Sequence, residues 1–269
     1  MEQLLIVQDI FVYPIKSLGG IRLSKAVVEE RGFRHDRRWM LVDDAGMFIT
    51  QRRHPNLALF QVDMGEGGLT VFYKNGNGTS VKIPFDVAVG PELMVTVWDD
   101  QVLAKIVHPD LNRWFSHFLG FQVCLVVMPE AVHRKVDAKY AVHSESVSFA
   151  DAMPYLLIGQ ESLIDLNSRL ESPVPMNRFR PNIVFSGGRP YLEDSFHKIR
   201  IGELEFQIVK PCARCVMTTV DQATGEKGKE PLKTLSSYRA INGKVLFGQN
   251  AVTLQAGEIK VGDAISMIE

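Results

Sequence analysis

The sequence contains little cysteine and histidine, which limits the metal sites it can form. Its three cysteines in 269 residues are an odd and low count that does not resemble the disulfide framework of a small secreted domain. A four-thiolate zinc site or an ordinary iron–sulfur cluster needs about four cysteines, and the seven histidines contain no His-x-x-x-His pair. The cysteine usage therefore predicts a reducing compartment, and we expect a cytoplasmic protein.

The sequence also lacks long apolar runs and the common nucleotide and hydrolase motifs. No run approaches the roughly 18 apolar residues of a membrane-spanning helix, and residues 1–14 read as a strand rather than a signal peptide. We therefore expect no membrane span. The patterns Gly-x-Gly-x-x-Gly and Gly-x-Ser-x-Gly and the P-loop are absent. With a net charge of −1, we expect no nucleic-acid partner.

Strand signals dominate the first hundred residues. Short apolar runs alternate with turns at residues 43–46, 75–78 and 99–100, a spacing typical of an antiparallel barrel or sandwich. Apolar residues then recur at helical spacing over residues 108–120 and 159–171. Further strands are predicted at residues 182–185, 204–209, 215–220 and 245–254, and two more near the C-terminal end. The pattern predicts a mainly β protein with some α, and a domain boundary near residue 120.

Two basic segments have features that suit an anion. "VYPIKSLGG" (12–20) leads from a strand into Lys16, Ser17 and two glycines, a combination that lets backbone N–H groups and a cation approach an anion. A plain polar turn is the alternative. Nine Lys or Arg against five Asp or Glu lie between Lys16 and Arg53. Among them, Arg37 is suited to phosphate recognition, although a charged strand edge has the same composition.

"VKPCARCVMTTVD" (209–221) carries two cysteines at a Cys-x-x-Cys spacing. Residues three apart in an extended segment point to opposite faces, so Cys212 and Cys215 are not expected to act as a pair. One of them can bind a soft or high-valent transition metal that something else mainly holds. Arg214 would favour the thiolate of Cys215. Two buried structural thiols are the alternative.

Several segments together resemble one family. "VYPIKS", "DRRWMLVD", "NRFRPNIV", "KPCARCVMTTVD" and "GEIKVGD" occur in the order found in proteins with an N-terminal MOSC β-barrel domain followed by a MOSC domain. Bacterial YcbX-like proteins and mitochondrial amidoxime-reducing components are such proteins. The resemblance covers essentially the whole chain. It implies a β-barrel-like MOSC N-terminal domain over residues 1–120 and a β-barrel MOSC domain over residues 121–269.

The resemblance also implies a molybdenum cofactor, with the metal on the dithiolene of a pterin that carries a phosphate. By position, Cys215 is the metal ligand. Contacts to the pterin and its phosphate fall on Lys16, Ser17, Arg37, Ala152, Met153, Arg180, Asn182, Ala213 and Arg214. Some relatives carry hydroxyl side chains at the positions of Ala152, Met153 and Ala213, so this chain cannot make those side-chain hydrogen bonds.

The activity that the resemblance implies is reduction of small N-oxygenated substrates, such as amidoximes or hydroxylamines. Asp151 is then the candidate that orients the substrate or relays a proton. Electrons would come from a separate donor, which could be a ferredoxin, a flavodoxin or a cytochrome b5-like protein with its reductase.

Three other functions stay open at this point. MOSC domains also form part of molybdenum-cofactor sulfurases, so the chain could be a sulfur carrier, with a partner because it carries no pyridoxal-phosphate desulfurase domain; pyridoxal phosphate is not expected as a cofactor. It could also bind the cofactor without reducing anything. A thiol redox or zinc module without pterin is the third possibility.

Overall fold

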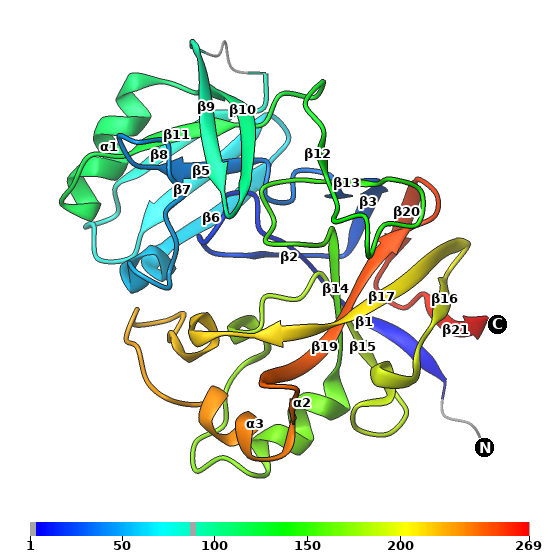
Figure 1. Ribbon diagram of the computed structural model, residues 1–269. Coiled ribbons are helices and arrows are strands. Elements are labelled where there is room, and N and C mark those ends of the chain that lie inside the picture. The colour runs from blue at the N-terminus through cyan, green and yellow to red at the C-terminus, as the bar shows by residue number, and fades with distance from the viewer. Residues whose placement is uncertain (1–3, 87–89, 269) are drawn as a thin grey trace.

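The computed structural model describes residues 4–86 and 90–268, which form a mainly β protein with three α-helices (Figure 1). The helices are α1 (Pro109–Leu119), α2 (Gln160–Asn167) and α3 (Leu232–Tyr238). The strands of the first half are β1 (Leu5–Val12), β2 (Ile21–Leu23), β3 (Lys25–Glu29), β4 (Gly32–Phe33), β5 (Trp39–Val42), β6 (Phe60–Gly65), β7 (Gly68–Tyr73), β8 (Ser80–Pro84), β9 (Glu92–Val97), β10 (Asp100–Ile106) and β11 (Cys124–Val127). Those of the second half are β12 (Arg134–Lys135), β13 (Ser146–Val147), β14 (Tyr155–Gly159), β15 (Ile183–Ser186), β16 (Lys198–Ile201), β17 (Leu204–Arg214), β18 (Ala240–Ile241), β19 (Lys244–Thr253), β20 (Gly257–Lys260) and β21 (Ala264–Ile268).

Seven strands close into a barrel. They pair in the order β14, β15, β1, β21, β16, β17 and β19, and β19 pairs back onto β14. The barrel interior holds an apolar cluster that includes Val7, Ile10, Tyr155, Phe185 and Phe206. Closure leaves no unpaired edge among these strands, and the barrel architecture confirms the predicted fold class.

The first strand belongs to the barrel rather than to the lobe that follows it. β1 pairs with β15 and with β21, both more than 170 residues further along the chain. Alternating buried side chains in β1 face the barrel core, as expected of a strand with one face on a core. The chain therefore builds the barrel from both of its halves. The domain boundary near residue 120 stays a prediction.

The other lobe holds β5 to β11 and α1, at the upper left of Figure 1. It contains a four-stranded sheet in the order β5, β11, β10, β9 and a three-stranded sheet of β6, β7 and β8. α1 begins at Pro109 with His108 as its N-cap and ends at Gly120, whose φ of 79° only glycine adopts readily. Its buried face packs into the cluster around Phe60 and Phe115. The helix predicted over residues 108–120 is confirmed.

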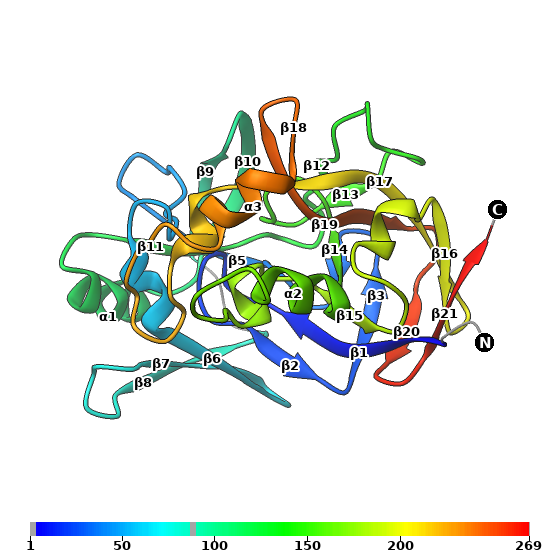
Figure 2. The same ribbon diagram turned by 90° about the horizontal axis from the view of Figure 1, so that it is seen from below.

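Two small helices cover one end of the barrel. Figures 1 and 2 both place α2 and α3 side by side. Leu163 and Leu166 of α2 share a buried cluster with Leu235 of α3 and Phe247 of β19. α2 confirms the second predicted helix in a shorter form, whereas α3 was not predicted. Among the described residues, no helix combines the length and apolar character that crossing a bilayer requires.

Two local predictions were wrong. Residues 215–220 were predicted as a strand, but Val216–Thr219 form a 3-10 helix. The hydroxyl of Thr218 donates to the Cys215 carbonyl at 3.0 Å and that of Thr219 to the Val216 carbonyl at 2.8 Å. Such local bonds compete with a strand ladder. The turn predicted at residues 99–100 lies one residue earlier, at Trp98 and Asp99, because Asp100 already pairs with Val97.

Candidate functional site

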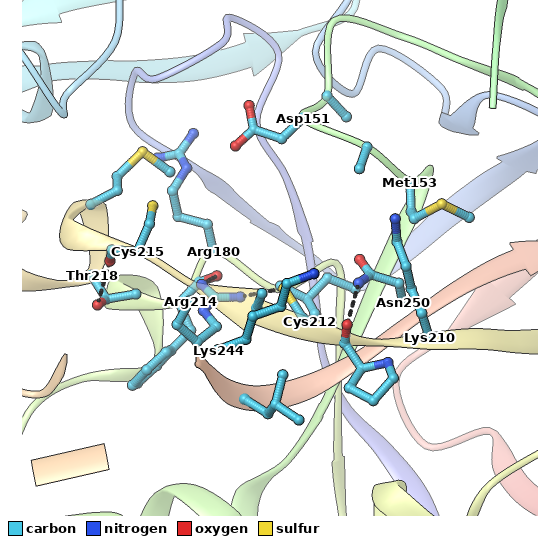
Figure 3. A pocket seen from close by; sticks show the side chains of 18 of the residues that line it. Asp151, Met153, Arg180, Lys210, Cys212, Arg214, Cys215, Thr218, Lys244 and Asn250 are labelled. Carbon is cyan, nitrogen blue, oxygen red and sulfur yellow. Dashed lines mark hydrogen bonds between the residues drawn. The ribbon is translucent and has the colours of Figure 1, made fainter. Parts of the chain in front are cut away.

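One cavity of about 910 Å³ lies where segments from both halves of the chain meet (Figure 3). Its lining comes from both lobes. The first half of the chain contributes the turn after β1, the loops before and after β5 and the tip of the β9–β10 hairpin. The second half contributes the loop before β14, the entry to β15, the end of β17 with the 3-10 helix after it, and the β18–β19 hairpin. Loops held on a rigid barrel are where binding residues usually lie. The cavity is therefore the candidate site.

All eleven residues predicted from the sequence line this cavity. They are Lys16, Ser17, Arg37, Asp151, Ala152, Met153, Arg180, Asn182, Ala213, Arg214 and Cys215. Seven Lys or Arg side chains line it against two Asp, and these are Lys16, Arg37, Arg52, Arg180, Lys210, Arg214, Lys244, Asp99 and Asp151. This balance of charge suits an anionic ligand.

Cys215 lies directly after β17 and before the 3-10 helix. Its sulfur accepts a hydrogen bond from Nε of Arg52 at 3.4 Å. The thiolate form of cysteine is the one that binds metals. In the described residues, no group of three or more His, Cys, Asp or Glu side chains is placed to hold a metal ion. Cys215 can therefore offer one soft ligand to a metal that another group mainly holds, rather than part of a complete protein site.

Cys212 is also a free thiol, and it differs from Cys215 in its surroundings. Its sulfur accepts a hydrogen bond from Nη1 of Arg214 at 2.9 Å, and its side chain packs partly against the apolar cluster of α2 and β19. The spacing of three residues in an extended segment predicts the two thiols on opposite faces, but in the structure both line the cavity. β17 has an irregular register between Pro211 and Ala213, which breaks the strict alternation of faces.

Asp151 is held between two cations. One carboxylate oxygen accepts from Nζ of Lys16 at 2.6 Å, and the other accepts from Nη2 of Arg52 at 2.5 Å. Burial alone would raise the pKa of Asp151, but Lys16 and Arg52 outweigh it and hold the pKa well below its usual value. Asp151 therefore stays ionised and links the turn after β1 to the arginine at Cys215.

The pKa of Lys16 carries a prediction about stability. Burial lowers this pKa from 10.5 to about 8, against the opposing effect of Asp151. Between about pH 8 and 10.5 the unfolded chain holds a proton that the folded chain has lost, so the Lys16 contribution to stability rises with pH there. We expect the stability of the cofactor-free protein relative to Lys16→Met to rise between pH 7.5 and 10, by an amount limited to on the order of 3 kcal/mol.

Denaturant unfolding of both proteins at several pH values measures this difference. Wild type and Lys16→Met share all other titrating groups, so the contributions of these groups to the stability difference largely cancel. A difference that is independent of pH would show that Lys16 keeps an ordinary pKa in the fold.

Arg180 is a buried cation that forms no ion pair with any described residue. Its side chain is 5% exposed, and no carboxylate in the described part of the chain forms an ion pair with it. Its guanidinium lies 4.1 Å from the Tyr13 ring centroid, and Nη1 donates to the Leu18 carbonyl at 2.7 Å. Nη2 is buried with no hydrogen-bond partner. Burial lowers the pKa of Arg180 to about 10, so the group remains charged at neutral pH.

A second orphaned donor lies close by in the lining. Nε of Arg214 is buried without a partner, while its Nη2 donates to the Phe179 carbonyl at 2.6 Å. Buried donors are almost always satisfied in folded proteins, and an unpaired buried charge is costly. Two unsatisfied guanidinium donors in one cavity fit a bound anion. The phosphate and pterin of a molybdenum cofactor, with Cys215 as the thiolate, match this set of donors.

Backbone strain is concentrated at the same cavity. Nine residues other than glycine have positive φ in the described ranges 4–86 and 90–268, and five of them line it: Ser17, Arg37, Trp98, Arg180 and Asn242. Each such conformation costs about 1–3 kcal/mol. Strain of this kind persists where surrounding contacts demand it and often marks a functional site.

Among the lining residues that were not predicted from the sequence, Arg52 and Trp98 both contact Asp151. Arg52 contacts both Cys215 and Asp151, and Trp98 packs over the Arg52 guanidinium at 4.6 Å. Arg52 lies in the basic stretch from Lys16 to Arg53, where composition alone does not distinguish it from the other cations. Trp98 directly follows β9, and no local sequence pattern marks it as a site residue.

Comparisons with known proteins agree with this architecture. Residues 4–122 match the family model described as the MOSC N-terminal beta barrel domain, and residues 144–266 match the MOSC domain. Mitochondrial amidoxime-reducing component 1 of Mus musculus is 35% identical over 100% of this chain and 84% of its own length. The Homo sapiens protein of that name is 33% identical with the same coverage. Molybdenum cofactor sulfurase of Arabidopsis thaliana is 33% identical over 90% of this chain, which covers 32% of that protein.

The barrel, the cavity and the two matched domains define a MOSC-domain protein. With 33–35% identity along its full length to two of them, the chain belongs to the family of the amidoxime-reducing components.

Proposed function

We propose that this protein reduces N-oxygenated compounds with a molybdenum cofactor bound in the cavity. The observation that carries the proposal is that the Cys215 thiol lines the same cavity as Arg180 and Arg214, each of which has a buried guanidinium nitrogen with no hydrogen-bond partner among the described residues. The relatives named for amidoxime reduction support the reaction. The molybdenum cofactor sulfurases among the relatives support the cofactor.

The cavity lining divides into two groups of contacts. Arg180 and Arg214 offer free donors for the cofactor's phosphate and pterin, with Lys16, Ser17, Arg37 and Asn182 beside them, and Ala152, Met153 and Ala213 completing the wall. Cys215 offers the metal ligand. When bound, such a cofactor supplies two-electron oxygen-transfer chemistry.

The balance of the reaction defines what the protein must provide. The N–O bond of an amidoxime breaks, two electrons and two protons are consumed, and an amidine and water leave. We infer that a separate protein supplies the electrons; a ferredoxin, a flavodoxin or a cytochrome b5-like protein with its reductase would suffice. Nε of Arg52 donates a hydrogen bond to the Cys215 sulfur, and Asp151 holds Arg52 in place by accepting from its Nη2.

Asp151→Asn separates an orienting role from a proton relay. We expect turnover to fall about tenfold, because groups that orient ligands contribute on this scale and Arg52 and Lys16 lose their shared counter-charge. The carboxylate is already ionised at neutral pH, so the shape of the pH–rate profile should persist. Benzamidoxime reduction measured from pH 5.5 to 8.5 provides the readout, with the exposed turn variant Asp44→Asn as the control.

Each other result for Asp151→Asn has a clear meaning. Loss of one limb of the pH profile would assign proton transfer to Asp151. Unchanged turnover in a metal-replete preparation would show that Asp151 neither orients groups in the site nor relays a proton.

The decisive experiment measures metal and pterin together. Protein made in a host that assembles the molybdenum cofactor is analysed for molybdenum and for the fluorescence of oxidised pterin, and then assayed for benzamidoxime reduction with an artificial electron donor. We expect molybdenum, pterin and turnover. Absence of both metal and pterin would overturn the proposal, and zinc alone would favour a thiol or zinc module.

A sulfur carrier is the second candidate, favoured by the similarity to molybdenum cofactor sulfurases. A persulfide on Cys215 without any reductase activity would support it. Molybdenum and pterin without either property would indicate a protein that only holds the cofactor.

A further inference from the structure

Trp98 has an unusual position in the backbone. It is the first residue of the two-residue loop between β9 and β10, and its φ is 58°. A bulky residue at positive φ is a genuine outlier, and glycine usually occupies such loop positions. The hairpin pairs regularly from Asp100–Val97 onward, so hairpin formation by itself gives no reason for a tryptophan at this position.

The contacts of Trp98 explain what keeps it there. The guanidinium of Arg52 lies 4.6 Å from its ring centroid, and the Phe48 ring lies 5.3 Å away at 53°. Its Nε1 donates to Oδ1 of Asp151 at 3.3 Å. These contacts attach the hairpin tip to the arginine that holds the Cys215 sulfur.

The contacts leave much of the indole free. The Trp98 side chain is 46% exposed and also lines the cavity. A large aromatic surface is thus presented to the cavity, in contact with Arg52 and Asp151. Exposed single hydrophobic residues are common on proteins, but here the residue is strained, bonded to the site and part of the lining.

We propose that Trp98 is a specificity-determining residue that selects flat, π-conjugated N-oxygenated substrates by stacking on its indole. This inference rests on the proposed function and identifies the substrate class of the same cavity. Indole rings stack on planar groups and attract cations. An amidoxime is planar and its amidine product is a planar cation, chemically close to the guanidinium that Trp98 already contacts.

The test compares a flat substrate with a small one that cannot stack. Benzamidoxime and hydroxylamine are assayed with molybdenum-loaded wild type, Trp98→Gly and Trp98→Phe. Glycine suits the positive φ and so keeps the loop while removing the ring. We expect the ratio of kcat/KM for benzamidoxime over hydroxylamine to fall about tenfold or more in Trp98→Gly, mainly through the KM of benzamidoxime. Trp98→Phe should restore part of the ratio.

The control is Met94→Ala, another exposed apolar residue of the same hairpin that does not line the cavity. Its substrate ratio should equal that of the wild type. A Trp98→Gly variant with an unchanged ratio, whatever its absolute activity, would overturn the proposal, because a purely structural tryptophan would affect both substrates alike.

A binding measurement makes the result independent of turnover. Isothermal titration of each protein with benzamidine, the planar product, should show about tenfold weaker binding to Trp98→Gly than to wild type or Met94→Ala. If wild type reduces neither substrate, the proposed reductase function fails and this titration alone decides the stacking role. If wild type reduces both substrates but Trp98→Gly has an unchanged kcat/KM ratio and unchanged benzamidine binding, the reductase function stands and only the proposed role of Trp98 fails.

Discussion

Cys215→Ser is expected to lower N-reductive activity at least about 100-fold. Groups outside the ligand shell contribute about 10–100-fold to metal sites, and removal of the ligand itself should exceed that. A serine hydroxyl is a hard ligand that stays neutral near pH 7, whereas thiolates suit soft metals. The assay is benzamidoxime reduction per bound molybdenum, so that loss of chemistry is distinguished from loss of cofactor.

Cys212→Ser is the matched control for this experiment. Cys212 also lines the cavity, but its sulfur only accepts from Arg214 and packs against the cluster of α2 and β19. A serine hydroxyl can accept the same bond. We expect activity within a few-fold of wild type and a stability loss of about 1 kcal/mol in thermal unfolding. A reversed pattern, with Cys212 essential and Cys215 dispensable, would show that the other thiol is the ligand.

Arg180→Met is expected to have two opposite effects. Cofactor content should fall about tenfold or more, because a buried charged donor that meets an anion contributes about 1.5–3 kcal/mol. The cofactor-free protein should become more stable, by about 2–4 °C in Tm. The reason is that Arg180 is buried with one unsatisfied nitrogen and no acidic partner among the described residues, so a methionine of similar length removes an uncompensated charge.

Molybdenum analysis and differential scanning fluorimetry measure the two effects separately. Arg113→Met, which removes an exposed arginine on α1, is the control and should change neither. If Arg180→Met lowered Tm and left the cofactor content intact, Arg180 would be a structural residue and the orphaned donor would need another explanation.

Local patterns predicted most of the secondary structure. The helix predicted from the apolar spacing over residues 108–120 matches α1, and Gly120 is its left-handed C-cap. This prediction succeeds because the buried stripe and the cap of a helix depend on residues within the segment. The pattern failed at residues 215–220, where threonine hydroxyls bond the backbone locally. It also missed α3, whose one buried residue, Leu235, leaves almost no periodic signal.

The sequence by itself determined which chemical groups the site could contain. Two cysteines at a Cys-x-x-Cys spacing, the basic stretch from Lys16 to Arg53 and the arginines near residue 180 are all visible without a fold. Their resemblance to one family joined them in a single prediction, and all eleven predicted residues line one cavity.

Only the tertiary structure decided how these groups act on one another. Arg52 meets Cys215 across 163 positions of sequence, and Lys16 meets Asp151 across 135. These contacts follow from barrel closure through β1, β14 and β19, which no local pattern encodes. Whether a donor is satisfied depends on every neighbour in space, so the orphaned nitrogen of Arg180 and the strained Trp98 against Arg52 appear only in the folded chain.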